Sequence, residues 1–163
     1  MRACGFNSAT AWLLGALIFT AGSTADAQTP SVVAEAIKNV FDDPFVQITT
    51  GIRNCPTPEG PSYTTQEARL QAHYRAERGT SCYRDGRCRL PNAYLYDKEI
   101  MPRVEKAILI DGRFSATSVW AEGQRRWVTL KGCVSSSEES AALEKLVRNL
   151  DDVESVVNEL KVQ

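Results

Sequence analysis

Histidine is nearly absent from this sequence, and its scarcity limits the chemistry that the chain can perform. The 163 residues contain one histidine, His73, in the stretch QAHYRAERG. Hydrolases with an activated nucleophile need a base, which is most often histidine, and no partner motif accompanies His73. The sequence also lacks a G-x-S-x-G motif, a phosphate-binding loop and a C-x-x-C redox motif. We therefore predict that the protein is not an enzyme; a hydrolase that uses His73 is the alternative.

Long hydrophobic runs are also absent, apart from one near the start. Residues 11–21 form an apolar run that is too short to span a bilayer comfortably. The run follows Arg2 and precedes an A-D-A pattern at residues 25–27, as in secretory signal peptides. We predict a signal peptide over residues 1–27, a periplasmic mature chain and no transmembrane segment after cleavage. An uncleaved anchor is the alternative.

Closely spaced cysteine pairs are missing as well, which argues against a zinc site. Zinc is usually bound by pairs such as C-x-x-C or by histidines at matched spacing. Cys4 precedes the apolar run and is expected to leave with the signal peptide. Four cysteines remain: Cys55, Cys82, Cys88 and Cys133. An even number in an exported chain predicts two disulfides, with three possible pairings. We predict no metal site and no cofactor.

Charge of one sign does not dominate the chain. The formal net charge is -1, so nucleic acid is not an expected partner. Arginines concentrate between residues 69 and 89, and acidic residues concentrate toward the C-terminus. These are either solvated faces, or two regions that attract one another inside the molecule, or an arginine surface that meets an anionic envelope.

The mature chain divides near Leu95 into two regions of different character. Residues 28–95 are expected to be helical and rich in loops. We predict a helix over residues 32–41, a second short helix that begins at Asp42-Asp43-Pro44, and a loop in CPTPEGPSY. Thr64 and Glu67 form a capping box that begins a helix ending at Gly79. The stretch CYRDGRC predicts a tight disulfide-closed loop or a hairpin.

Residues 96–163 have a more regular pattern. We predict a helix over residues 102–114, two strands around Glu122-Gly123-Gln124, a helix over 138–150 and a strand over 153–162. Two helices on one face of a small sheet make a two-layer α+β unit of the order α-β-β-α-β.

Three stretches of this region resemble a known family. They are WVTLKGCV at residues 127–134, SSSEESAALEKLVRNL at 135–150 and DDVESVVNELKV at 151–162. From about Glu99 to Val162 the chain is similar to the BON domain, a small bacterial exported module. Asp152 stands where the family commonly has glycine. The resemblance implies a non-catalytic protein associated with phospholipid or envelope binding and with envelope integrity. In some members the first BON helix touches the membrane.

Strand alternation in residues 127–134 predicts where Cys133 points. One face carries Val128, Leu130, Gly132 and Val134, and the other carries Trp127, Thr129, Lys131 and Cys133. The first face suits a core under the helices, and Gly132 would let a helix approach closely. Cys133 then faces away from the helices. Cys82 and Cys88 are close enough to pair with each other, so we predict the disulfides Cys55–Cys133 and Cys82–Cys88.

Two groups of residues are candidates for a lipid or partner surface. The first combines apolar and basic side chains on one predicted helix: Arg103, Lys106, Leu109, Ile110 and Arg113. The second gathers at the strand hairpin: Trp120, Arg125, Arg126 and Trp127. These features are typical of interfacial helices and of protein interfaces. The alternatives are that residues 28–95 cover Leu109 and Ile110, and that the tryptophans pack across strands.

The candidate partners are an anionic phospholipid or an envelope protein. A protein-interaction module without lipid binding is the main alternative function. Such a module would bind a partner strand at the free edge of the last strand. The alternative is that charged side chains on that edge prevent such pairing.

Overall fold

The computed structural model describes residues 36–163. The expected signal peptide, and residues 32–35 of the first expected helix, lie outside this part of the chain. The described residues form a four-stranded sheet, a small two-stranded sheet and four α-helices.

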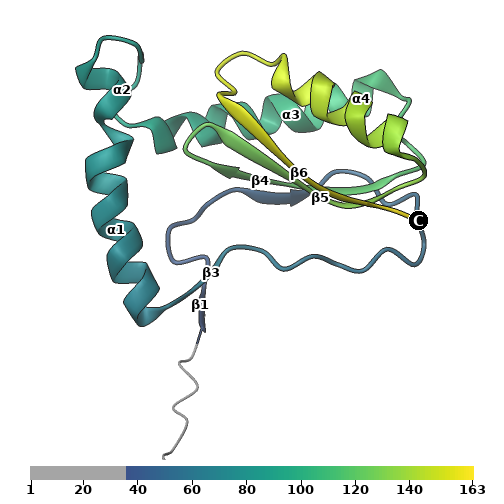
Figure 1. Ribbon diagram of the computed structural model, residues 1–163, viewed down its shortest axis with the longest axis horizontal. Helices are drawn as coiled ribbons and strands as arrows, with labels where there is room; N and C mark the ends of the chain where they lie inside the picture. The colour runs from purple at the N-terminus through teal and green to yellow at the C-terminus, as the bar shows by residue number, and fades with distance from the viewer. Residues whose placement is uncertain (1–35) are drawn as a thin grey trace, which may run out of the picture. The chain divides into compact units, whose positions relative to one another are not determined.

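The four-stranded sheet has the order β2-β4-β5-β6. Its strands are β2 (Phe45–Gln47), β4 (Ser118–Gln124), β5 (Trp127–Val134) and β6 (Ser155–Val162). Neighbours are antiparallel except β5 and β6, which run parallel because α4 (Ser137–Arg148) connects them. Helices α3 (Asp97–Asp111) and α4 cover one face of the sheet (Figure 1). The predicted α+β class and the α-β-β-α-β order are confirmed.

The main core lies between this sheet and the two helices. Its fully buried side chains come from β5, from α3 and from α4: Val128, Leu130, Val134, Val104, Ile108, Leu143 and Val147. Every second residue of β5 therefore faces the helices, as its alternation predicts.

The opposite face of the sheet is covered by residues 48–61, which we name the covering segment. In Figure 1 this segment runs along the sheet on the side away from α3 and α4. Ile52 exchanges two hydrogen bonds with the Ser118 hydroxyl, at 2.9 and 3.0 Å. Cys55 forms a disulfide with Cys133, with 5.7 Å between the Cα atoms. Trp120 is only 6 % exposed. It is therefore buried rather than part of the surface proposed from the sequence.

Gly132 is required for a reason other than helix approach. Its φ is +115°, and a Cβ atom there would lie 2.1 Å from the carbonyl oxygen of Ser118. The close neighbour is thus the backbone of β4, and the prediction that Gly132 makes room for a helix is wrong.

The start of the described chain differs from its prediction. Residues 36–38 form strand β1 (Ala36–Lys38), which pairs with β3 (Ser62–Thr64), instead of a helix. Residues 45–47 form β2 instead of a second short helix. Positive φ values at Asn39 and Asp42 turn the chain sharply between β1 and β2. Residues 45–47 are a strand because they form backbone hydrogen bonds with the edge of β4, and no local sequence pattern indicates this distant partner.

Other boundaries were predicted more closely. The Thr64–Glu67 capping box begins α1 (Thr65–Gly79) as expected. The Cys82–Cys88 disulfide closes a loop that holds α2 (Ser81–Arg84), rather than a hairpin.

Helix α3 begins five residues before the expected start, directly after the 3₁₀ turn η1 (Ala93–Tyr96). Pro102 consequently lies inside the helix, where its missing N–H costs one intrahelical hydrogen bond.

The hairpin between β4 and β5 turns at Arg125-Arg126, not at residues 122–124. Both arginines have positive φ, of 57° and 66°. Left-handed backbone at a residue other than glycine costs roughly 1–2 kcal/mol.

A buried ion pair joins α1 to the rest of the fold. The Arg75 guanidinium donates to both carboxylate oxygens of Asp43, with one Nη1–Oδ1 distance of 2.8 Å. Its two faces stack on Phe41 and Tyr94, at 4.0 and 4.3 Å from the ring centroids. Tyr63 also donates a hydrogen bond to Asp43. Asp43 thus does not begin the short helix that is predicted at Asp42-Asp43-Pro44.

Removing the long-range disulfide should destabilise the protein more than removing the short one. The two bonds span 78 and 6 residues. The chain-entropy model gives about 4.5 and about 2 kcal/mol for loops of these lengths. We expect Cys55→Ala/Cys133→Ala to lower the free energy of unfolding in urea by about twice as much as Cys82→Ala/Cys88→Ala. Equal losses would show that the covering segment does not depend on its disulfide.

Truncating Arg75 should be strongly destabilising, because it leaves the Asp43 carboxylate buried without its cation. We expect Arg75→Ala to lower the free energy of unfolding by roughly 3–5 kcal/mol. Arg75→Lys should restore little, since lysine lacks the planar fork and the stacking faces. Arg78→Ala, on the exposed side of the same helix, is the control and should stay near wild type.

Candidate binding surface

The C-terminal end of α3 exposes two large apolar side chains. Leu109 is 54 % and Ile110 is 72 % exposed. Ile100, Val104 and Ile108 form the buried stripe of this helix, so the next two positions turn toward solvent. No described residue covers Leu109 and Ile110. The interpretation that residues 28–95 pack over them is therefore wrong for the part of that region that the structure describes.

Two basic side chains flank this apolar pair. Both are exposed; Lys106 lies three and four helical positions before Leu109 and Ile110, and Arg113 follows the end of the helix, after the left-handed turn at Gly112. Arg113 is in part neutralised, because its Nη2 lies 2.7 Å from an Asp111 carboxylate oxygen. We name Lys106, Leu109, Ile110 and Arg113 the α3 end patch.

Arg103 does not belong to this patch. Its guanidinium donates to the Asp152 carboxylate at 3.0 Å, and both side chains are about one-third exposed. This ion pair fixes α3 to the turn before β6. Arg103 is thus better explained as a structural contact than as a free charge for a ligand.

The hairpin residues lie at the other end of α3. The backbone N–H groups of Arg125 and Arg126 both donate to the carboxylate of Asp97, the first residue of α3, at 2.7 Å each. Twelve residues of helix separate Asp97 from Leu109, which is roughly 18 Å. The two candidate groups from the sequence therefore form two separate surfaces.

Only part of the hairpin group is available at the surface. The Arg126 guanidinium lies over the Tyr96 ring, and its Nε donates to the backbone oxygen of Asp152 at 2.8 Å. Arg125 stacks on Trp127, whose side chain is 40 % exposed. Of the hairpin group, Arg125 and Trp127 are thus the two residues that are left to form a small aromatic and cationic surface.

Asp97 is a buried residue that the sequence interpretation missed. It is 2 % exposed, and burial raises its pKa to about 6. The two backbone N–H donors at the hairpin act in the opposite direction, because they stabilise the carboxylate. Asp97 holds the strained turn in place. Its only sequence signal was an acidic residue in the first turn of a helix, which is common.

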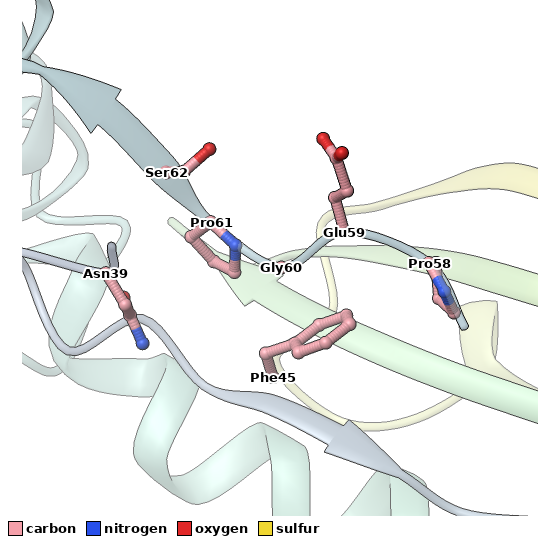
Figure 2. Close-up of a pocket in the computed structure, with 7 residues that line it drawn as sticks. All are labelled: Asn39, Phe45, Pro58, Glu59, Gly60, Pro61 and Ser62. Atoms are coloured by element: carbon pink, nitrogen blue, oxygen red, sulfur yellow. The ribbon is translucent and has the colours of Figure 1, made fainter. Parts of the chain in front are cut away.

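Two clefts flank the covering segment. In the first, Phe45 lies beside Pro58, Gly60 and Pro61, and the cleft has a volume of about 620 Å³ (Figure 2). In the second, Pro56 and Glu59 stand opposite Glu159 and Lys161 of β6, around a volume of about 510 Å³. Neither cleft was expected from the sequence, because each requires the covering segment to lie across the sheet.

His73 lies on α1, away from these clefts. Its Nε2 is 3.3 Å from a Glu77 carboxylate oxygen, and the two side chains are 69 % and 61 % exposed. An open helix surface does not exclude water from a nucleophile. Within residues 36–163 no cluster of three or more His, Cys, Asp or Glu side chains could hold a metal ion.

These features define a small two-layer α+β module with exposed surfaces. Residues 96–163 match the family model of the BON domain. Helices α3 and α4 and strands β4 to β6 all lie within the match. BON domains are generally non-catalytic, which is consistent with an envelope-associated module. A search of the curated proteins found no match to the chain. No helix in the described part has the length and hydrophobicity to cross a bilayer.

The burial of Asp97 predicts a pH dependence of stability. Its folded pKa of about 6 lies above the ordinary value of 3.8, so the folded state favours the neutral acid. The contribution of Asp97 to the free energy of unfolding is therefore fully present below pH 3.8 and is lost as pH rises through about 6. A shift of this size corresponds to roughly 3 kcal/mol at most.

Urea denaturation across this pH range tests the effect. We expect the free energy of unfolding of the wild type, relative to Asp97→Asn, to fall between about pH 4 and about pH 6. The exposed Asp151→Asn variant should follow the wild type. A constant difference between the wild type and Asp97→Asn would rule out this assignment.

Proposed function

We propose that this protein is a non-enzymatic component of the bacterial envelope that binds anionic phospholipid headgroups through the α3 end patch. The observation that carries the proposal is the exposure of Leu109 and Ile110 between Lys106 and Arg113 on one helix end. Adjacent apolar side chains of this size can insert into the headgroup region, while the cations approach lipid phosphates.

Other features support an envelope location. Two disulfides join cysteines in the described fold, and disulfides persist in oxidising compartments such as the bacterial periplasm. The N-terminal apolar run with its A-D-A motif suits export to that compartment. We therefore place the protein in the periplasm, where it would support envelope integrity.

The membrane contact involves a helix end rather than a whole helix face. Arg103 is held by Asp152, and the buried stripe of α3 is committed to the core. Binding of this limited kind should be weak and reversible. It should also fall with rising salt, because the electrostatic part comes mainly from Lys106, since Arg113 is paired with Asp111.

Flotation with phosphatidylglycerol-containing vesicles at low salt tests the proposal. We expect the oxidised chain to float with these vesicles but not with purely zwitterionic ones. Leu109→Ser/Ile110→Ser should reduce the bound fraction roughly tenfold, because about 1.4 kcal/mol of lost apolar insertion suffices for that change.

The chain offers a matched control. Leu70 and Tyr74 are 53 % and 41 % exposed on α1, four residues apart. Leu70→Ser/Tyr74→Ser removes a similar exposed apolar pair and should leave binding unchanged. If the wild type stays unbound at low salt, or if the α1 variant loses binding instead, the α3 end patch is not the lipid site.

A further inference from the structure

Strand β6 is an open edge of the four-stranded sheet. It has eight residues and pairs only with β5 (Figure 1). The opposite edge is strand β2, which has only three residues and pairs with β4. Ile48 and Gly51 continue this pairing by donating to Val119 and Thr117, at 2.8 and 2.7 Å. Within the described residues, β6 is therefore the longer of the two edges of this sheet, and the one with most backbone to offer a further strand.

The hydrogen bonds identify which groups of β6 face outward. The N–H of Gln163, next in line, donates to Val134 at the end of β5, at 3.0 Å. Backbone groups alternate sides along a strand, so the odd-numbered residues of β6 bond to β5. The N–H of Leu160 accordingly does not reach β5, and it donates to the Asn158 side chain at 3.2 Å. Residues 156, 158, 160 and 162 thus direct their N–H and C=O groups away from β5, and the Leu160 N–H would exchange its bond to Asn158 for one to a new strand.

We propose that a second copy of this chain pairs with β6 in antiparallel fashion, about a two-fold axis at Leu160. In this register Glu159 of each copy lies opposite Lys161 of the other, and Asn158 lies opposite Val162. Outward-facing residues meet outward-facing residues, as antiparallel pairing requires. The inference does not depend on lipid binding by the α3 end patch.

The charges of Glu159 and Lys161 favour this register over those with the two-fold axis at a neighbouring residue. An axis at Glu159 or at Lys161 would place like charges directly opposite one another, which is destabilising. An axis at Asn158 would place Glu159 opposite Val157. The axis at Leu160 gives two opposite-charge pairs and a leucine pair. The self-complementary order Glu-Leu-Lys at residues 159–161 makes this possible.

The surroundings of these side chains leave room for a partner. Glu159 and Lys161 are exposed, and neither forms an ion pair within the described residues. Both residues line the cleft of about 510 Å³ beside the covering segment. Val162 is 57 % exposed and would be covered across the axis.

Sedimentation of the oxidised full chain over a wide concentration range tests the proposal. We expect a reversible dimer. Glu159→Lys and Lys161→Glu should each weaken the dimer roughly tenfold or more, because each turns both attractive pairs into repulsive ones. The exposed Glu138→Lys and Lys145→Glu variants on α4 carry the same charge changes and should dimerise normally.

Mixing the two edge variants gives the decisive measurement. The Glu159→Lys chain carries a positive side chain at both edge positions, and the Lys161→Glu chain carries a negative side chain at both. In the Leu160 register each positive side chain of one variant then lies opposite a negative side chain of the other. The equimolar mixture should therefore regain dimerisation to near the wild-type level.

Three results would each overturn the proposal: a monomeric wild type, unaffected single variants, or a mixture that stays monomeric. If the wild type is monomeric, a strand of some other protein would be the remaining candidate partner for the β6 edge.

Discussion

The attachment of the covering segment to the sheet is the constraint on which the rest of this structure depends. A sheet with two helices on one face leaves its other face open, and here that face carries Trp120 and Cys133. Residues 48–61 shield it, and the Cys55–Cys133 disulfide limits how far they can depart from it. The same attachment brings β2 alongside β4 and creates both clefts. Strand β2, from the region before the BON match, therefore belongs to the same sheet as β4, β5 and β6.

Two buried carboxylates perform different structural tasks. Asp43 accepts charge-assisted hydrogen bonds from Arg75 of α1 and one hydrogen bond from Tyr63 of β3, and so holds α1 against the two-stranded sheet of β1 and β3. Asp97 has no cation in direct contact and instead accepts two backbone N–H groups from a strained turn. Asp43 is stabilised mainly by its ion pair with Arg75. For Asp97, two backbone hydrogen bonds offset only part of the free-energy cost of burying a carboxylate. This difference explains why Asp97 has a strongly raised pKa.

The sequence predicted those features that local patterns determine. Alternation in residues 127–134 identified the face of Cys133, and cysteine spacing identified both disulfides. It failed where distant partners decide the local structure. Residues 45–47 are a strand because β4 offers an edge, and Arg125-Arg126 form a turn because Asp97 receives their N–H groups. The sequence leaves open whether Leu109 and Ile110 are exposed or covered, because the answer depends on where residues 28–95 pack.

The pairing of β2 with β4 has a consequence for how copies of this module can assemble. A sheet with two free edges can grow in both directions and form an open-ended fibre. Here the edge opposite β6 is β2, which has only three residues. A symmetric pair through β6 would therefore leave only the two short β2 strands at its outer edges, where little backbone can bind a further strand, and this disfavours filament formation.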